Sequence, residues 1–321
     1  MFNEKSPIYL TMTIYLHCGG HKTASSFMKM FLRKNKALFE AQKIAVHLDH
    51  FRDREVTAED IIKLAKKDYQ NNYQQVIISE DANIIGLMPG IFQVGDRNFF
   101  NTNSILKFAN LIARVNQQFP TKFLLCVRRQ DTYLESCYKF RKTHGAKYSL
   151  ERFLNKVEKI NVSWYDLVNA VASYIGAENC LVTPYELLKK SQSEFISTFF
   201  SKITQIDLKQ VIVPPPNNQG ASELMMATID YFDNKFTEIP NKHRQEILAI
   251  IKKHQAKNAI KSSLLSAKDK NKILQKYATS NQKLFSNYIQ YLPADYYDVA
   301  DFNHKTANNT VPSYQLLTTN Y

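Results

Sequence analysis

Short apolar runs alternate with stretches of helical period along the first two thirds of this chain. Five runs have the length of strands and are rich in β-branched and aromatic residues. They lie at residues 13–18, 44–48, 75–79, 122–127 and 180–183. Between them, apolar positions recur every three or four residues, which predicts helices at 27–42, 58–66, 104–118, 134–142 and 166–175. This alternation predicts an α/β fold with a doubly wound parallel sheet of about five strands.

The last third of the chain has a different pattern. Three prolines are followed by two asparagines, a glutamine and a glycine in segment 214–220, a composition that ends regular structure. Helical patterns alone follow it, at residues 223–236, 243–254 and 267–291. We therefore expect an α/β core at 12–213, a helical region at 214–302 that packs on the core or extends it, and a flexible polar tail at 303–321.

The ends of the predicted strands carry most of the residues with candidate chemistry. In a parallel sheet all strands end at one edge, and ligands bind beyond that edge. The residues at these ends are His21, Lys22, His47, Glu80 and Arg128. We expect them to gather around one site.

The densest group of polar residues follows the first strand. It consists of Gly20, His21, Lys22, Thr23, Ala24, Ser25 and Ser26. A strand, a glycine turn and a helix start place free backbone N–H groups and the positive end of the helix dipole at this point. An ammonium group and three hydroxyls in the same turn add donors for a phosphate or a sulfate. The loop is not a Walker A loop, because His21 separates Gly20 from Lys22.

A second group follows the fourth predicted strand. That strand ends in Arg128 and Arg129, and Ser136 lies eight residues after Arg128 on the following helix. A guanidinium group binds phosphate through two parallel hydrogen bonds, and a hydroxyl adds a third. Taken alone, two arginines at this position are also compatible with a simple role in capping the end of the strand. Together with the first loop they indicate a second phosphate-binding element.

Both elements resemble those of sulfotransferases that use 3'-phosphoadenosine 5'-phosphosulfate (PAPS). The first is similar to the 5'-phosphosulfate-binding loop of the bacterial form, with Ala24 where that family usually has glycine. Arg128 with Ser136 resembles the 3'-phosphate-binding element, and Tyr185 resembles an adenine-contacting tyrosine, although packing on the sheet end explains Tyr185 equally well. The resemblance implies a P-loop-like sulfotransferase fold, PAPS as co-substrate and no required metal. It implies nucleotide contacts from Gly20, His21, Lys22, Thr23, Ala24, Ser25, Ser26, Arg128, Ser136 and Tyr185.

Sulfuryl transfer to a hydroxyl needs charge stabilisation and a proton acceptor. Lys22 is placed to neutralise charge on the leaving oxygen. Glu80 directly follows the third strand and resembles the glutamate base of sulfotransferases that act on glycans. A capping or salt-bridging role is the alternative for Glu80. His47 competes for the role of base, because the ordinary pKa of histidine lies nearer neutrality.

The resemblance to the bacterial form implies a carbohydrate or glycolipid acceptor, such as a capsular or lipopolysaccharide sugar. Acceptor specificity would lie in loops such as 86–100, whose sequence does not indicate which acceptor they bind. One alternative is a P-loop kinase that uses ATP, for which the Walker A pattern is broken and Asp81 is the only tempting Mg²⁺ ligand. Another is a catalytically inactive nucleotide-binding scaffold, which the replacement of the loop glycine by Ala24 favours slightly.

The composition of the chain limits the classes of binding partner that we expect. The formal net charge of +13 favours anionic partners, but the basic residues are spread along helices and form no known nucleic-acid-binding module. We therefore expect a nucleotide and an acidic glycan rather than nucleic acid. No apolar run approaches the ~20 residues of a membrane span, and no signal-peptide pattern begins the chain. Peripheral membrane contact and the oligomeric state stay open.

The spacing of the cysteines indicates in which cellular compartment the protein is expected. Cys18, Cys126, Cys137 and Cys180 are far apart, and their spacing against the histidines does not suit a zinc site. Buried free thiols in a reducing compartment are the simplest interpretation, so we expect a cytoplasmic protein.

Overall fold

The computed structural model describes residues 11–20, 22–51, 55–80, 102–201, 203–204, 207, 209–215, 221–235, 241–254 and 263–298. Several predictions from the sequence concern residues outside these ranges. They are those for His21, for Asp81, for the loop 86–100 and for the tail 303–321.

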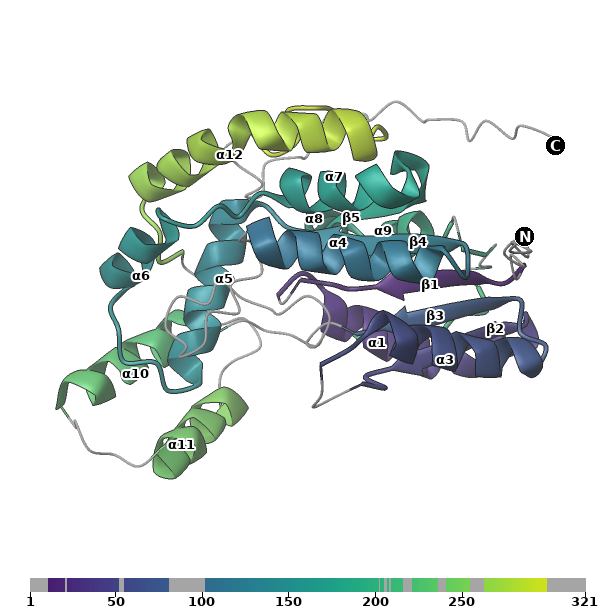
Figure 1. The fold of residues 1–321 in the computed structure, drawn as a ribbon. Coiled ribbons are helices and arrows are strands. Elements are labelled where there is room, and N and C mark those ends of the chain that lie inside the picture. Colours follow the sequence, from purple (N-terminus) through teal and green to yellow (C-terminus); the bar gives the residue numbers. More distant parts are fainter. Residues whose placement is uncertain are drawn as a thin grey trace.

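In the described part of the chain, five strands form one parallel sheet (Figure 1). They are β1 (Thr13–His17), β2 (Ile44–Leu48), β3 (Gln75–Ser79), β4 (Thr121–Val127) and β5 (Cys180–Pro184). The order across the sheet is β2-β3-β1-β4-β5, and all neighbours are parallel. The predicted parallel sheet is confirmed, and each strand boundary lies within one residue of its prediction.

The strand order determines where a ligand crevice forms. The chain passes from β1 to β2 and β3 on one side, and then crosses to β4 and β5 on the other side of β1. The connections that leave β1 and β4 therefore run in opposite directions across the sheet, so their direction reverses between these two neighbouring strands. In open α/β sheets, the crevice beyond the carboxyl ends at such a reversal is the usual binding site.

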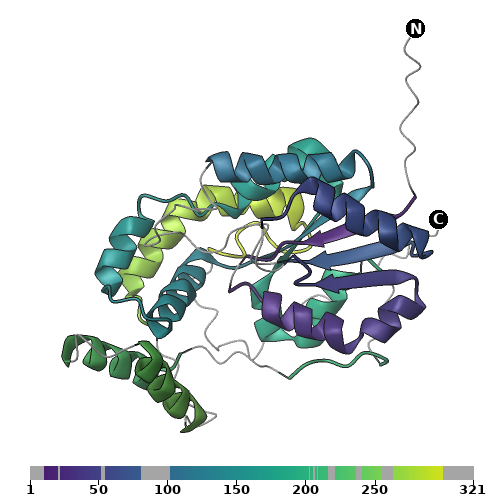
Figure 2. The ribbon, with the colours of Figure 1, turned by 60° about the horizontal axis from the view of Figure 1, so that its bottom comes forward.

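Helices cover both faces of the sheet (Figure 2). One face carries α3 (Ala58–Gln70), α4 (Thr102–Asn116), α7 (Trp164–Ile175) and α12 (Ala267–Tyr288). The other face carries α1 (Ser25–Lys34), α2 (Lys36–Ala41), α8 (Tyr185–Lys190) and α9 (Gln192–Phe200). The doubly wound arrangement expected from the alternating pattern is confirmed.

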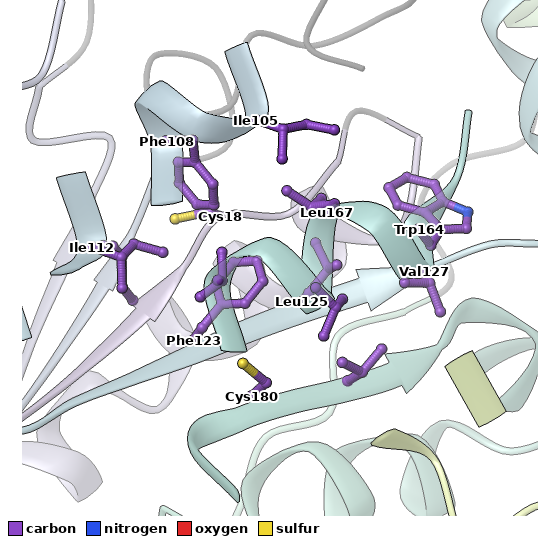
Figure 3. Packing of buried hydrophobic residues seen from close by; sticks show 14 of the residues in the cluster. Cys18, Ile105, Phe108, Ile112, Phe123, Leu125, Val127, Trp164, Leu167 and Cys180 are labelled. Atoms are coloured by element: carbon purple, nitrogen blue, oxygen red, sulfur yellow. The ribbon is translucent and has the colours of Figure 1, made fainter. Parts of the chain in front are cut away.

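Residues of one strand alternate between two hydrophobic clusters. Ile14 and Leu16 of β1 belong to the cluster under α4 and α7, and Tyr15 belongs to the cluster under α1 and α9. Figure 3 shows the first cluster, in which Phe108 of α4 lies over Phe123 of β4. Burial on both faces explains why the strands are continuous apolar runs rather than alternating ones.

The single helix predicted for residues 27–42 is wrong, because α1 and α2 are separate helices that meet at Asn35. The buried Asn35 amide donates to the carbonyl of Phe31 at 2.8 Å and to the carbonyl of Ile212 at 3.0 Å. Its Oδ1 accepts from the Ile212 N–H at 2.7 Å. A side chain that bonds backbone groups in this way competes with the helical ladder.

The remaining helices lie between β4 and α7 and in the last third of the chain. They are α5 (Gln130–Thr143), α6 (Leu150–Val157), α10 (Glu223–Lys235) and α11 (Asn241–His254). The sequence patterns missed α6, α8 and α9, each of nine residues or fewer. Helix α12 contacts α5 and α7, and its residues Tyr277, Leu284 and Phe285 belong to the cluster under α7.

The four cysteines are buried free thiols, as the sequence predicted. None of the helices that the structure describes combines the length and the apolar character needed to cross a membrane.

Candidate functional site

The loop after β1 has a strained backbone. Lys22 and Ala24 adopt left-handed conformations, with φ of 68° and 78°. Helix α1 begins directly afterwards, and its N-cap Ala24 provides no side-chain hydrogen bond to the first turn. Ala24 therefore does not supply the usual side-chain cap to the first-turn N–H groups, and helix starts with such N–H groups are sites where anions bind.

Ala24 occupies a position that favours glycine. An L-residue in the left-handed region costs roughly 1–2 kcal/mol, a cost that glycine avoids. This conformation gives a physical reason for the glycine that is usual in the loop that the sequence resembles, and the alanine of this chain carries the steric cost.

Gly19 and Gly20 lie so close to neighbouring side chains that a Cβ atom at either position would crowd them. A Cβ atom on Gly20 would lie 3.0 Å from Cη2 of Trp164, and one on Gly19 would lie 2.9 Å from Nε2 of His17. The loop therefore packs directly on the end of the sheet and on the start of α7.

The three predicted hydroxyl donors have different surroundings. Thr23 is buried, and its hydroxyl donates to the carbonyl of Gly20 at 2.6 Å, which closes the loop on itself. Ser25 is buried at the first position of α1, and Ser26 is exposed. Thr23 therefore shapes the loop, and Ser25 and Ser26 stay as candidates for anion contact.

Arg128 links the ends of three strands. Its Nη1 donates to the carbonyl of Lys22 at 3.0 Å, and its Nε donates to Oγ1 of Thr132 at 3.0 Å. Its guanidinium carbon lies 4.6 Å from the centroid of the Tyr185 ring. Because Lys22, Arg128 and Tyr185 follow β1, β4 and β5, one half-buried arginine joins the elements of the predicted nucleotide site.

Arg129 has a different environment from its neighbour. It is buried, and its guanidinium pairs with Asp131 through two hydrogen bonds of 2.8 Å each. Its backbone N–H donates to Oε1 of Glu186 at 3.2 Å. Arg129 therefore fixes the junction between β4 and α5, and the role of Arg128 as the anion ligand stays a prediction.

One face of α5 carries residues that contact the loop and the strand end. Thr132, Ser136 and Phe140 are spaced by four residues and so share this face. Arg128 bonds Thr132 at one end, and Lys22 Nζ lies 5.1 Å from the Phe140 ring centroid at the other. The half-buried Ser136 lies between the points where the two cations contact the helix. The structure thus brings Lys22, Arg128 and Ser136 together.

The electrostatics of the neighbouring Cys137 agree with this geometry. Burial raises the pKa of the Cys137 thiol to about 12, while a hydrogen bond from Tyr133 and the charges of Arg128 and Lys22 act against that rise. Both cations therefore exert their field on the same turn of α5.

Carboxylates gather at the ends of β2 and β3. Glu80 is only 1% exposed, and its Oε1 accepts the N–H of Phe51 at 3.1 Å. Burial raises the pKa of Glu80, hydrogen bonds from the backbone of Phe51 and His50 lower it, and the charge of Asp49 raises it further. Asp49 itself pairs with Lys29 of α1 at 2.8 Å, and its side chain is 27% exposed.

Sequence reasoning missed Asp49. It is the first acidic residue after β2, just as Glu80 follows β3, so the rule that selected Glu80 applies equally to it. Its φ of 52° places it in a left-handed turn, and its N–H donates to the carbonyl of Ser79 at 3.1 Å. Asp49 is therefore the accessible member of a pair of carboxylates.

His47, the second candidate base, is paired with a helix. Its Nε2 lies 2.6 Å from Oδ2 of Asp68 on α3, and its ring makes an edge contact with His50. His47 thus lies at the same edge of the sheet, with one ring nitrogen held by a carboxylate.

Tyr185 begins α8 and is half-buried. Besides the Arg128 guanidinium, the ammonium of Lys189 lies 5.4 Å from its ring centroid. The ring is therefore a cation–π partner of both side chains, and its contact with adenine stays a prediction.

Across the described ranges, no cluster of three or more His, Cys, Asp or Glu side chains is arranged to hold a metal ion.

Comparison with known proteins finds only distant matches among solved structures. No family model matches the chain, and no curated protein matches it. Among solved structures, the sulfotransferase domain from the Synechococcus PCC 7002 olefin synthase matches with a TM-score of 0.37 and 10% identity, over 85% of this chain and 96% of that one. The sulfotransferase domain from the curacin biosynthetic pathway matches with a TM-score of 0.38 and 10% identity, over 84% of this chain and 98% of that one.

Proposed function

We propose that this protein is a sulfotransferase that transfers the sulfuryl group of PAPS to a hydroxyl of a carbohydrate or glycolipid. The observation that supports the proposal is the contact between the two candidate phosphate-binding elements at the ends of β1 and β4. Arg128 donates to the Lys22 carbonyl, and Ser136 lies between the two cations on α5. The uncapped start of α1 adds N–H donors beside them.

The roles of these residues follow from the bonds that change. The acceptor oxygen attacks sulfur, the bond from sulfur to the bridging 5'-phosphate oxygen breaks, and the acceptor proton moves to a base. Lys22 and the first turn of α1 would stabilise the charge that develops on the leaving phosphate. Arg128 and Ser136 would hold the 3'-phosphate, which ATP lacks.

We assign the proton acceptor to the pair Glu80 and Asp49 rather than to His47. The Asp49 charge raises the pKa of Glu80, so the two carboxylates act on one another, and Asp49 provides access to solvent. His47 is instead held against Asp68. The carbohydrate acceptor rests on the sequence resemblance to the bacterial sulfotransferases.

Calorimetry with 3'-phosphoadenosine 5'-phosphate, ATP and AMP tests the nucleotide. Tight binding of the first alone is expected, because only that nucleotide presents both phosphates. Equal or tighter binding of ATP would contradict the proposal and favour a kinase.

Binding does not separate an enzyme from an inactive scaffold. Transfer of labelled sulfate from PAPS to extracted bacterial glycans is therefore the second measurement. Tight binding with no transfer to any glycan or small hydroxyl acceptor would favour the scaffold.

A further inference from the structure

Trp164 contacts both elements of the candidate nucleotide site. It is the one tryptophan of the chain, and it is buried at the first position of α7. Its indole Nε1 donates to the carbonyl of Arg128 at 2.8 Å. Its ring carbons lie 3.0 and 3.4 Å from the position that a Cβ on Gly20 would take. Figure 3 shows its side chain near Val127, the last residue of β4.

The position of Trp164 affects the distance between the side chains of Lys22 and Arg128. Gly20 lies two residues before Lys22, so the indole packs against the loop that carries the ammonium group. The indole N–H fixes the peptide of Arg128, whose guanidinium donates to the Lys22 carbonyl. Tyr133 of α5 supports the ring with an edge contact at 5.1 Å. The indole is thus a rigid spacer between β4 and the loop after β1.

Helix α12 holds the segment that leads into Trp164. The hydroxyl of Tyr277 accepts the N–H of Val162 at 3.0 Å and donates to the carbonyl of Ile160 at 3.1 Å. Asn281, one turn later, exchanges two amide hydrogen bonds of 2.9 and 3.0 Å with Gln130, the first residue of α5. All three side chains are buried. Helix α12 therefore fixes both α5 and the start of α7 at the site.

We propose that Trp164 is a positioning residue that sets the separation of Lys22 and Arg128, and that Tyr277 of α12 maintains it. The inference rests on the proposed function in so far as the anion is a nucleotide with two phosphate groups. It assigns the C-terminal helix a role in binding, through a hydrogen bond to the segment before Trp164 rather than through contact with the ligand.

The first test compares Trp164→Phe with wild type by calorimetry, using 3'-phosphoadenosine 5'-phosphate as the probe. Phenylalanine keeps an aromatic ring but cannot donate to the Arg128 carbonyl, so we expect binding to weaken by roughly tenfold. Thermal unfolding of each variant identifies any variant that fails to fold. Unchanged affinity in a folded Trp164→Phe variant would overturn the inference and leave the proposed function standing. Wild-type protein that binds none of the nucleotides would overturn both.

The second test uses a double-variant cycle, which detects coupling between Trp164 and the loop through their contact. Gly20→Ala places a methyl group against the indole, so we expect it to weaken binding of the same probe. Phenylalanine lacks the two ring carbons that the methyl group would meet. The double variant Gly20→Ala/Trp164→Phe should therefore lose less affinity than the two single losses combined. Additive losses in the double variant would contradict a shared contact.

The third test addresses α12 with a matched pair of variants. Tyr277→Phe removes the hydroxyl that holds residues 160 and 162, and Tyr288→Phe removes a hydroxyl that bonds Asn169 of α7 at 3.1 Å. Tyr277→Phe thus removes two hydrogen bonds and Tyr288→Phe removes one, and each change acts between α12 and the α7 region. We expect Tyr277→Phe to weaken nucleotide binding and Tyr288→Phe to leave it unchanged. Equal affinities in the two variants would overturn the role of Tyr277.

Discussion

The carboxyl edge of the sheet has two halves with opposite chemistry. The ends of β1 and β4 carry Lys22 and Arg128, beside an uncapped helix start. The ends of β2 and β3 carry Asp49 and Glu80, together with their partners. Both halves lie beyond the same row of strands, yet they differ in how the charged groups are satisfied.

In the acidic half, internal partners hold the charged groups. Glu80 accepts a loop N–H, Asp49 pairs with Lys29, and His47 pairs with Asp68. In the cationic half, the hydrogen bonds of Arg128 position it while the first-turn N–H groups of α1 have no side-chain cap. We therefore expect the cationic half to be organised in advance for an anion. The acidic half requires a substrate to compete with existing contacts.

The largest expected effect tests the acidic half. The proton acceptor typically contributes roughly 10²–10⁴-fold to the rate, so we expect Glu80→Gln and Asp49→Asn to lower turnover by that order while nucleotide affinity stays unchanged. His47→Asn should lose much less. Steady-state kinetics over a range of pH identifies the acceptor, because its variant loses the acidic limb of the pH profile. A reversed pattern, with only His47→Asn inactive, would make the histidine the base.

Lys22→Ala tests the cationic half. Loss of one group that stabilises transition-state charge costs roughly 10²–10³-fold in rate, and we expect such a loss with little change in the midpoint of thermal unfolding. Lys36→Ala is the matched control, because Lys36 is exposed at the start of α2 and forms a surface ion pair with Glu40. Turnover near wild type in Lys22→Ala would remove the loop from the mechanism.

Arg128 and Arg129 are neighbours at the end of β4, and we expect their substitution to have different effects, one on nucleotide binding and the other on stability. Arg129→Ala leaves Asp131 buried without its partner, which should destabilise the fold by about 3–5 kcal/mol in urea unfolding.

Arg128→Ala should instead keep most of the stability and weaken binding of 3'-phosphoadenosine 5'-phosphate by about 10- to 100-fold. AMP binding measures what the 3'-phosphate adds. An unchanged affinity ratio between the two nucleotides in Arg128→Ala would show that Arg128 does not bind the 3'-phosphate.

The smallest expected effect concerns the strain in the loop. Ala24→Gly removes the steric cost of the left-handed conformation, so we expect a gain of about 1 kcal/mol in the free energy of unfolding. Ala113→Gly, within the fifteen-residue helix α4, is a suitable control, because glycine inside a helix destabilises. A loss of stability in Ala24→Gly equal to that of the control would contradict the assigned strain.

Local patterns were sufficient to predict the sheet. A strand buried on both faces is a continuous apolar run, and each of the five runs became a strand within one residue of its predicted bounds. The break at Asn35 could not be predicted in this way, because it depends on Ile212, a residue 177 positions away. The short helices α8 and α9 were also missed, because so few turns give little periodicity.

The sequence by itself determined which residue types stand at the strand ends, since parallel strands bring all of these ends to one edge. Only the tertiary structure decided their partners. It holds Arg129 to Asp131, joins Arg128 to the Lys22 carbonyl, and places Trp164 against Gly20. Such contacts connect residues of several elements, and their distances depend on how helices α5, α7 and α12 pack. Local sequence patterns report the period and polarity of one segment, and so they do not contain this information.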